Sequence, residues 1–544
     1  MKKHILYIIA IISTTTVIAQ NTTEDGNLGN ENVVVVKDYE AFIEDAQRIK
    51  INPATPEQEF EKIDVEYNVP NKLMNLDYPA HTMRPLAMPK LKREKYQNSY
   101  LRIGFGTQLS PLAEIAYHDD NLEDFQFGAY YKHLSAYGQK IKNQSFRDNE
   151  AGIYFQYFKK KIQIGADVNY TQNVDYFYGY NHDSLEFKKD EIKQRVSEVG
   201  ASVYMTNGAA NMKNVDFAQT LSFSNMSDAY DVKEWYVNFQ TDISKTFNNK
   251  HIIHTFGEVD VSNYIPTFGD DLEREYFQLG ADYTFNNDDF KLTAGLTTAW
   301  GEAAPDGKFN LYPTVYTEKK LFKNYLIFYS SWSRRLQKNS YLNFVQQNPY
   351  ININPELKNG RVEDRIAGFK GTAKKYTYNV KFSNKVIKEM ALFVNDTLDE
   401  KRFDIVYDKN MTVINLNAEM GYTFSPKFHA LLGFDFMLYE PDEQAEAWHM
   451  PAFKTNLLLK YNLKKKFFLT GEIYSLAGAK TRLANGDAEK IKGMVDLNLG
   501  AEYQFSKYLS FFVQLNNLAN FKYEKWQHYP TYGFNGRIGA QLSF

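Results

Sequence analysis

From Tyr100 to its last residue, the chain alternates apolar and polar residues with a period of two. The final segment shows this best, because apolar residues or glycine occupy every second position from Tyr532 to Phe544. The same alternation runs through residues 414–424 and 495–505. Side chains of a β-strand point alternately to opposite faces. The pattern therefore predicts strands with one apolar face and one polar face.

Two features of these segments favour lipid, rather than a protein core, as the surroundings of the apolar face. Many segments run to roughly ten residues or more, whereas strands of globular proteins centre on about five or six. Many also end in Tyr or Phe, the residues that form aromatic girdles at membrane interfaces. The chain has 40 Tyr and 40 Phe, enough to supply two such girdles and part of a lipid-facing surface.

The connections between the segments alternate between short turns and long polar loops. The expected short turns are Ser110–Pro111, Asn248–Lys250, Ser425–Lys427, Lys464–Lys466 and Ser506–Tyr508, and the expected long loops are His182–Lys193, Leu336–Gly360 and Ala479–Glu489. Outer-membrane barrels show this asymmetry, with tight periplasmic turns and long external loops. Only a closed barrel leaves no strand edge unpaired in lipid.

The sequence therefore predicts an all-β fold, a transmembrane antiparallel outer-membrane β-barrel, over residues 98–544. We count about 22 candidate strands there, an even number as in bacterial barrels. The mean hydropathy of −0.51 is compatible with this fold, because half of each strand faces water. Barrels of this width normally have a filled lumen.

The N-terminus has the three regions of a secretory signal peptide. A basic start, an apolar run from Ile5 to Ile12 and small residues up to Ala19 predict a signal peptide over residues 1–19. Gln20 is not a cysteine, so no lipid anchor is expected there. Residues 20–97 are rich in proline and lack sustained alternation, which predicts a short, partly irregular periplasmic segment.

Three features resemble TonB-dependent receptors. Asn348–Lys358 resembles the Asn-Pro…Asn-Pro-Glu-Leu-Lys run before a mid-barrel strand, and Asn516–Glu524 resembles the penultimate-strand Asn-Leu-x-Asn-x-x-Tyr motif. The terminal Phe544 resembles the aromatic signal that the barrel-assembly machinery reads. The resemblance covers roughly residues 98–544 and implies an outer-membrane transport or receptor pore.

The chain departs from these receptors before the barrel. Their plug is well over a hundred residues long and rich in glycine, whereas residues 20–97 contain two glycines, Gly26 and Gly29. The chain thus resembles plug-less, receptor-type barrels of the Bacteroidetes group. We expect the lumen to be occluded by residues 20–97, by the loop Leu336–Gly360 or by a partner chain.

The run Val33, Val34, Val35 and Val36 has two interpretations. It resembles a TonB box, an extended peptide that pairs with TonB by strand addition. It is also a plain short β-strand, because valine is a good strand former, and we favour this second interpretation. Engagement of TonB is therefore left open.

No catalytic, cofactor-binding or metal motif stands out, and we expect no enzyme activity. The chain lacks G-x-S-x-G and H-E-x-x-H motifs. His251 and His254 are three residues apart, so on a strand they face opposite sides and do not share a metal ion. The 63 basic and 66 acidic residues leave no positive footprint for nucleic acid.

Two functions remain open from the sequence. The first is a transport or receptor pore in the outer membrane of a Gram-negative cell, in contact with membrane lipid and lipopolysaccharide. The second is a non-transporting accessory subunit of an outer-membrane complex such as the protein-assembly machinery. The expected partners are that machinery and a surface lipoprotein or periplasmic protein.

Overall fold

The computed structural model describes residues 98–119, 124–207, 215–301 and 309–544. The first barrel strands are β1 (Ser99–Gly106), β2 (Ser110–Asp119), β3 (Phe125–Tyr137), β4 (Ser145–Phe158), β5 (Ile162–Tyr176), β6 (Lys193–Asn207), β7 (Val215–Ser227), β8 (Lys233–Phe247), β9 (His251–Ile265), β10 (Leu272–Asn286) and β11 (Phe290–Trp300). The second half contains β12 (Phe309–Phe322), β13 (Leu326–Gln337), β14 (Gly360–Ala373), β15 (Tyr376–Asn395), β16 (Phe403–Ser425), β17 (Phe428–Glu440), β18 (Phe453–Leu463), β19 (Phe467–Ala477), β22 (Met494–Gln504), β23 (Leu509–Asn516) and β26 (Asn535–Ser543).

Shorter elements lie in the connections. They are the helix α2 (Tyr341–Gln347) and two small hairpins, β20 (Lys480–Arg482) with β21 (Ala488–Lys490) and β24 (Glu524–Trp526) with β25 (Tyr529–Pro530). Among the described residues, no helix is long and apolar enough to cross a membrane.

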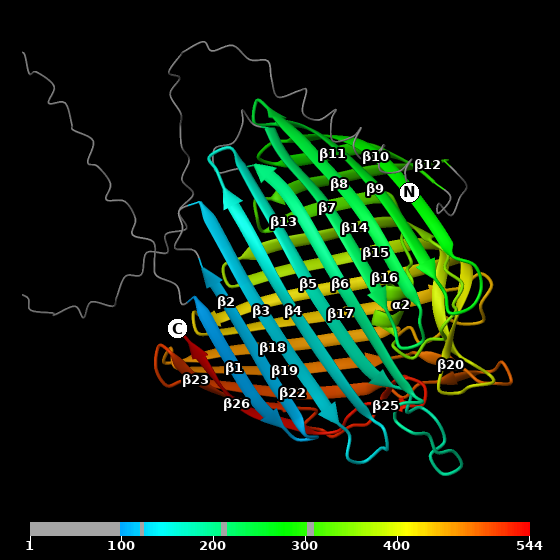
Figure 1. Ribbon diagram of the computed structural model, residues 1–544. Helices are drawn as coiled ribbons and strands as arrows, with labels where there is room; N and C mark the ends of the chain where they lie inside the picture. Colours follow the sequence, from blue (N-terminus) through cyan, green and yellow to red (C-terminus); the bar gives the residue numbers. More distant parts are fainter. Residues whose placement is uncertain (1–97, 120–123, 208–214, 302–308) are drawn as a thin grey trace, which may run out of the picture. The chain divides into compact units, whose positions relative to one another are not determined.

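The main sheet is a closed, 22-stranded antiparallel barrel, as the sequence predicts (Figure 1). Each strand pairs with its neighbour along the chain, and β26 pairs with β1 to close the ring. At this seam Ser99 and Phe544 exchange two backbone hydrogen bonds of 2.9 Å. Closure removes the strand edges, so the backbone needs no partner from lipid.

The predicted alternation places apolar side chains on the outside of the barrel. Ile103 and Phe105 on β1 and Ile538 on β26 are more than half exposed, although all three are strongly apolar. Arg102 and Arg537, which directly precede Ile103 and Ile538, lie on the inner face, where they are only partly accessible. An apolar exterior around a polar interior is the architecture of an outer-membrane barrel.

Among the described connections, one rim of the barrel has only short turns, and the other has the long connections together with several shorter ones. The turns at Asn248–Lys250 and Lys464–Lys466 lie at the short-turn rim, where β1 begins and β26 ends. The prediction for Ser110–Pro111 is wrong. The turn is formed one step earlier by Gln108 and Leu109, both with positive φ, so Ser110 begins β2 at the long-loop rim.

Candidate functional site

Four connections of the long-loop rim pack into one structure, which we call the loop cap. It consists of residues 177–192 after β5, 338–359 between β13 and β14, 396–402 between β15 and β16, and 517–534 between β23 and β26. Its apolar core also includes residues at the long-loop ends of several strands. The buried residues of this core include Tyr178, Tyr264, Tyr341, Leu342, Phe344, Ile351, Phe393, Phe403, Trp526 and Tyr529.

Three of these connections start from widely separated points on the barrel. Around the ring, eight strands lie between the connections 177–192 and 338–359, and eight more lie between 338–359 and 517–534. The remaining six strands lie between 517–534 and 177–192. At a strand spacing of about 4.8 Å, eight strands correspond to an arc on the order of 40 Å. Contacts among these three connections therefore require at least two of them to extend across the mouth.

Three tyrosines make those contacts. The ring centroids of Tyr350 and Tyr529 are 3.5 Å apart, those of Tyr178 and Tyr529 are 4.9 Å apart, and those of Tyr178 and Tyr350 are 6.1 Å apart. The Tyr178 hydroxyl also donates a 3.0 Å hydrogen bond to the Pro530 carbonyl. Since Tyr178 lies two residues beyond β5, the other two connections meet close to the β5 wall.

The asparagine motifs of the sequence shape the two long connections. Asn348 ends α2, because its backbone N–H bonds the Phe344 carbonyl and Pro349 follows it. Asn517 adopts a left-handed backbone with φ of 49°. Its side-chain amide donates to the carbonyls of Phe521 and Tyr532, at 2.7 and 3.1 Å. These bonds hold the two halves of the connection between β23 and β26 together. The residues from Tyr532 onward that the sequence predicts to begin the final strand therefore belong to this connection, up to the start of β26 at Asn535.

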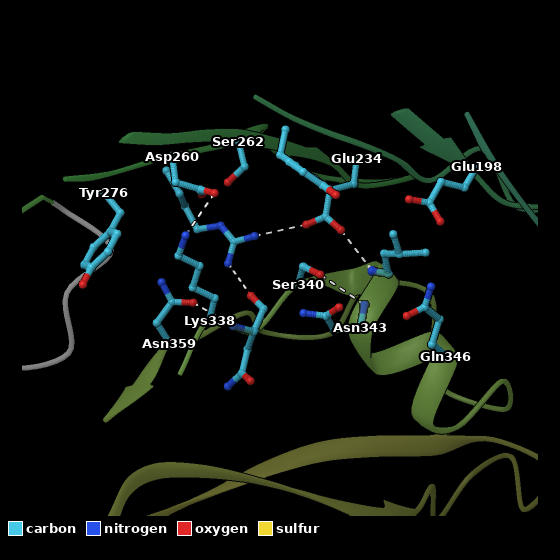
Figure 2. Close-up of a pocket in the computed structure, with 14 residues that line it drawn as sticks. Glu198, Glu234, Asp260, Ser262, Tyr276, Lys338, Ser340, Asn343, Gln346 and Asn359 are labelled. Carbon is cyan, nitrogen blue, oxygen red and sulfur yellow. Dashed lines mark hydrogen bonds and ion pairs between the residues drawn. The ribbon is translucent and has the colours of Figure 1, made fainter. Parts of the chain in front are cut away.

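The start of α2 is anchored to the barrel wall by Glu234 of β8 (Figure 2). Its carboxylate, which is 3% exposed, accepts hydrogen bonds from the backbone N–H groups of Leu342 at 3.0 Å and Tyr341 at 3.3 Å. Arg274 of β10 forms a 3.1 Å ion pair with the same carboxylate. The Tyr341 hydroxyl donates to Asp228 at 2.8 Å.

Two further contacts fix the residues just before the helix. Arg274 donates to the Asn339 carbonyl at 2.6 Å, so one guanidinium joins the wall to the connection. Lys338 pairs with Glu258 and, at 3.1 Å, with Asp260 of β9. We call Glu234, Arg274 and Lys338, with their partners, the wall anchor. It surrounds a polar cavity of about 290 Å³.

Burial keeps several titratable groups of the cap and of the adjoining connection between β17 and β18 uncharged. Burial raises the pKa values of Tyr341, Tyr350 and Tyr529, so their hydroxyls stay protonated. Burial lowers the pKa of His449, in the connection between β17 and β18, to about 4. His449 packs against Phe403 and is therefore neutral at physiological pH.

A second cavity of about 580 Å³ lies beside the cap, between it and the wall formed by β15, β18 and β19. Its lining combines aromatic rings from the cap and from the connection between β17 and β18 with three lysines. These lining residues include Phe344, Trp448, Trp526, Lys454, Lys492 and Lys525. We call it the lysine cavity.

Several residues that the sequence analysis singled out lie outside the described residues or remain untested. The signal peptide, residues 20–97 and Val33–Val36 lie outside the described residues, and the assembly role of Phe544 stays a prediction. His251 contacts Tyr283, whereas His254 bonds Asp282 and Asp242. Within the described ranges, no group of three or more His, Cys, Asp or Glu residues is placed to hold a metal ion.

The wall anchor and the tyrosine contacts were not found from the sequence. Glu234 and Arg274 lie 40 residues apart on strands that are not adjacent, and no spacing rule connects them. In the sequence, only the predicted occluding loop Leu336–Gly360 pointed to this site, because that loop carries Lys338 and α2.

The fold defines a class, the large outer-membrane barrel, and solved structures share it. No protein-family model and no curated protein matches this sequence. The FrpB iron transporter from Neisseria meningitidis is 11% identical with a TM-score of 0.68, over 83% of this chain and 82% of that one. The siderophore receptor PirA from Pseudomonas aeruginosa is 11% identical with a TM-score of 0.62, over 83% and 81%. A ferric enterobactin receptor from the same organism is 10% identical with a TM-score of 0.64, over 82% and 80%. At such identities the likeness concerns the fold.

Proposed function

We propose that this protein is an outer-membrane transport or receptor barrel whose lumen is occluded by its own loop cap. The observation that supports this most directly is the meeting of Tyr178, Tyr350 and Tyr529, which come from three distant points of the ring. The shared fold with an iron transporter and siderophore receptors supports the receptor class.

A barrel of this width without internal filling would be an open pore. The wall anchor supports a regulated closure, because polar contacts and side-chain packing hold α2 to the wall, whereas no sheet pairing does. Such contacts can be broken and remade when a ligand or a periplasmic protein acts on the cap. TonB is one candidate for that protein.

Purification from native membranes distinguishes this function from the accessory role. We expect an affinity-tagged chain to be recovered without stoichiometric assembly-machinery subunits, and a deletion strain to lose growth on a particular nutrient. Stoichiometric recovery with those subunits, without any nutrient-dependent growth defect, would support the accessory role and contradict our proposal.

A further inference from the structure

We propose that the lysine cavity is a binding site for a small anionic ligand with a flat aromatic or apolar body. The statement that this ligand is the transported molecule rests on the proposed function. Binding itself can be measured on the closed protein. Neither the sequence motifs nor the structural likeness assigns a ligand to this cavity.

The apolar wall of the cavity is made of buried aromatic rings from the cap and from the connection between β17 and β18. Trp448 and Trp526 are 2% and 9% exposed, so their positions are fixed by packing. The ring of Phe393 packs edge-on against Trp526, with centroids 5.1 Å apart, and against Phe344 at 6.1 Å. Pre-formed aromatic walls of this kind bind flat rings with little loss of side-chain entropy.

The polar wall carries an excess of positive charge. Lys454 projects from β18, Lys492 from the connection before β22, and Lys525 from β24. Among the described residues, none of these three lysines forms an ion pair with a carboxylate. Glu524, the one acidic residue in the lining, accepts a 2.8 Å hydrogen bond from the His528 backbone N–H. His449 is neutral and adds no charge.

The lysines are also close enough to affect one another. The pKa of Lys525 is lowered, first by burial and then by the positive charge of Lys454. Its side chain nonetheless reaches solvent and is available to a ligand. A bound anion would relieve the repulsion between the two ammonium groups and replace their missing counter-charge. A cation or a neutral molecule would gain no such stabilisation.

Calorimetric titration of the purified full chain in detergent tests this inference, with 2-naphthoate as the probe and 2-naphthamide as its neutral analogue. We expect 2-naphthoate to bind at least about tenfold more tightly than 2-naphthamide. The double variant K454M/K525M should lose that preference, and K454R/K525R should retain it. K381M, which removes a lysine of β15 near the opposite rim, should bind like the unchanged protein.

Three results would overturn the inference. They are no binding of 2-naphthoate, equal affinity for both probes, and unchanged preference in K454M/K525M. Resistance of each variant to unfolding in unheated detergent confirms that its barrel is intact. Because the titration needs no open pore, its failure is distinguishable from failure of the proposed function, which the native-membrane purification tests separately.

Discussion

Tyr350 and Tyr529 stack with their ring centroids 3.5 Å apart and their planes 15° from parallel. The first follows α2 in the connection between β13 and β14, and the second lies in β25, between β23 and β26. Since eight strands separate the two connections on the ring, this single contact joins distant parts of the barrel mouth. It joins two of the connections that form the loop cap.

Truncation of this contact should loosen the cap without unfolding the barrel. Removal of a large buried aromatic side chain typically costs about 3–5 kcal/mol. We expect Y529A to increase protease cleavage within residues 338–359 while the strands stay protected. Y170A removes an exposed tyrosine of β5 and serves as the control. Equal cleavage of Y529A and the unchanged protein would mean that the stack does not hold the cap.

Loss of the wall anchor should release α2. Breaking one side of a buried ion pair costs roughly 3–5 kcal/mol, because the remaining charge is left uncompensated. We expect E234Q to speed hydrogen exchange of the α2 amides by about a hundredfold or more. E198Q is the matched control, because Glu198 lines the same cavity but bonds Ser224 and not the helix. Similar exchange in both variants would exclude Glu234 as the anchor.

Acid should destabilise the cap through His449. Its folded pKa of about 4 lies below the unfolded value of about 6.5, so the unfolded form binds more protons between these values. The stability of the cap is therefore full above about pH 6.5 and is lost as the pH falls toward 4. The loss amounts to roughly 3 kcal/mol at the acidic end.

Tryptophan fluorescence can follow this transition, because the His449 and Trp526 rings lie 5.3 Å apart. We expect the emission to change between about pH 6.5 and 4 in the unchanged protein, and the H449Q variant to lack that change. A transition of the same size in H449Q would assign it to other groups.

The terminal residue should matter for assembly rather than for the finished fold. Phe544 is 67% exposed, and its two hydrogen bonds to Ser99 come from the backbone. We expect F544A to lower severalfold the amount of folded barrel recovered from membranes, with little effect on the thermal stability of the recovered fraction. F534A removes another exposed aromatic and should have a smaller effect. Normal recovery of F544A would contradict the assembly role.

The barrel could be predicted because each strand carries its own signal. The outward positions of Leu416, Met420 and Phe424 on β16 follow directly from period-two alternation. Ser110–Pro111 was misplaced because serine and proline favour turns, whereas the turn is made by Gln108 and Leu109.

The cap was not predictable in the same way. Its contacts join residues far apart in sequence, such as Tyr178 and Tyr529, and single-sequence patterns carry no information about such pairs. The lysine cavity has the same origin, because Lys454 and Lys525 come from separate elements that only the closed ring brings together. The sequence placed the connection Leu336–Gly360 close to its observed position, 338–359, whereas the fold determined what that connection touches.

Electrical recording in planar bilayers tests occlusion by the loop cap most directly. We expect the full chain to show no large, steady conductance, and a variant whose residues 338–359 are replaced by Asn-Gly to form a steady open pore. A variant lacking residues 20–97 should remain closed. A large, steady pore in the unchanged chain, or a pore opened by loss of residues 20–97 and not by loss of 338–359, would contradict the account.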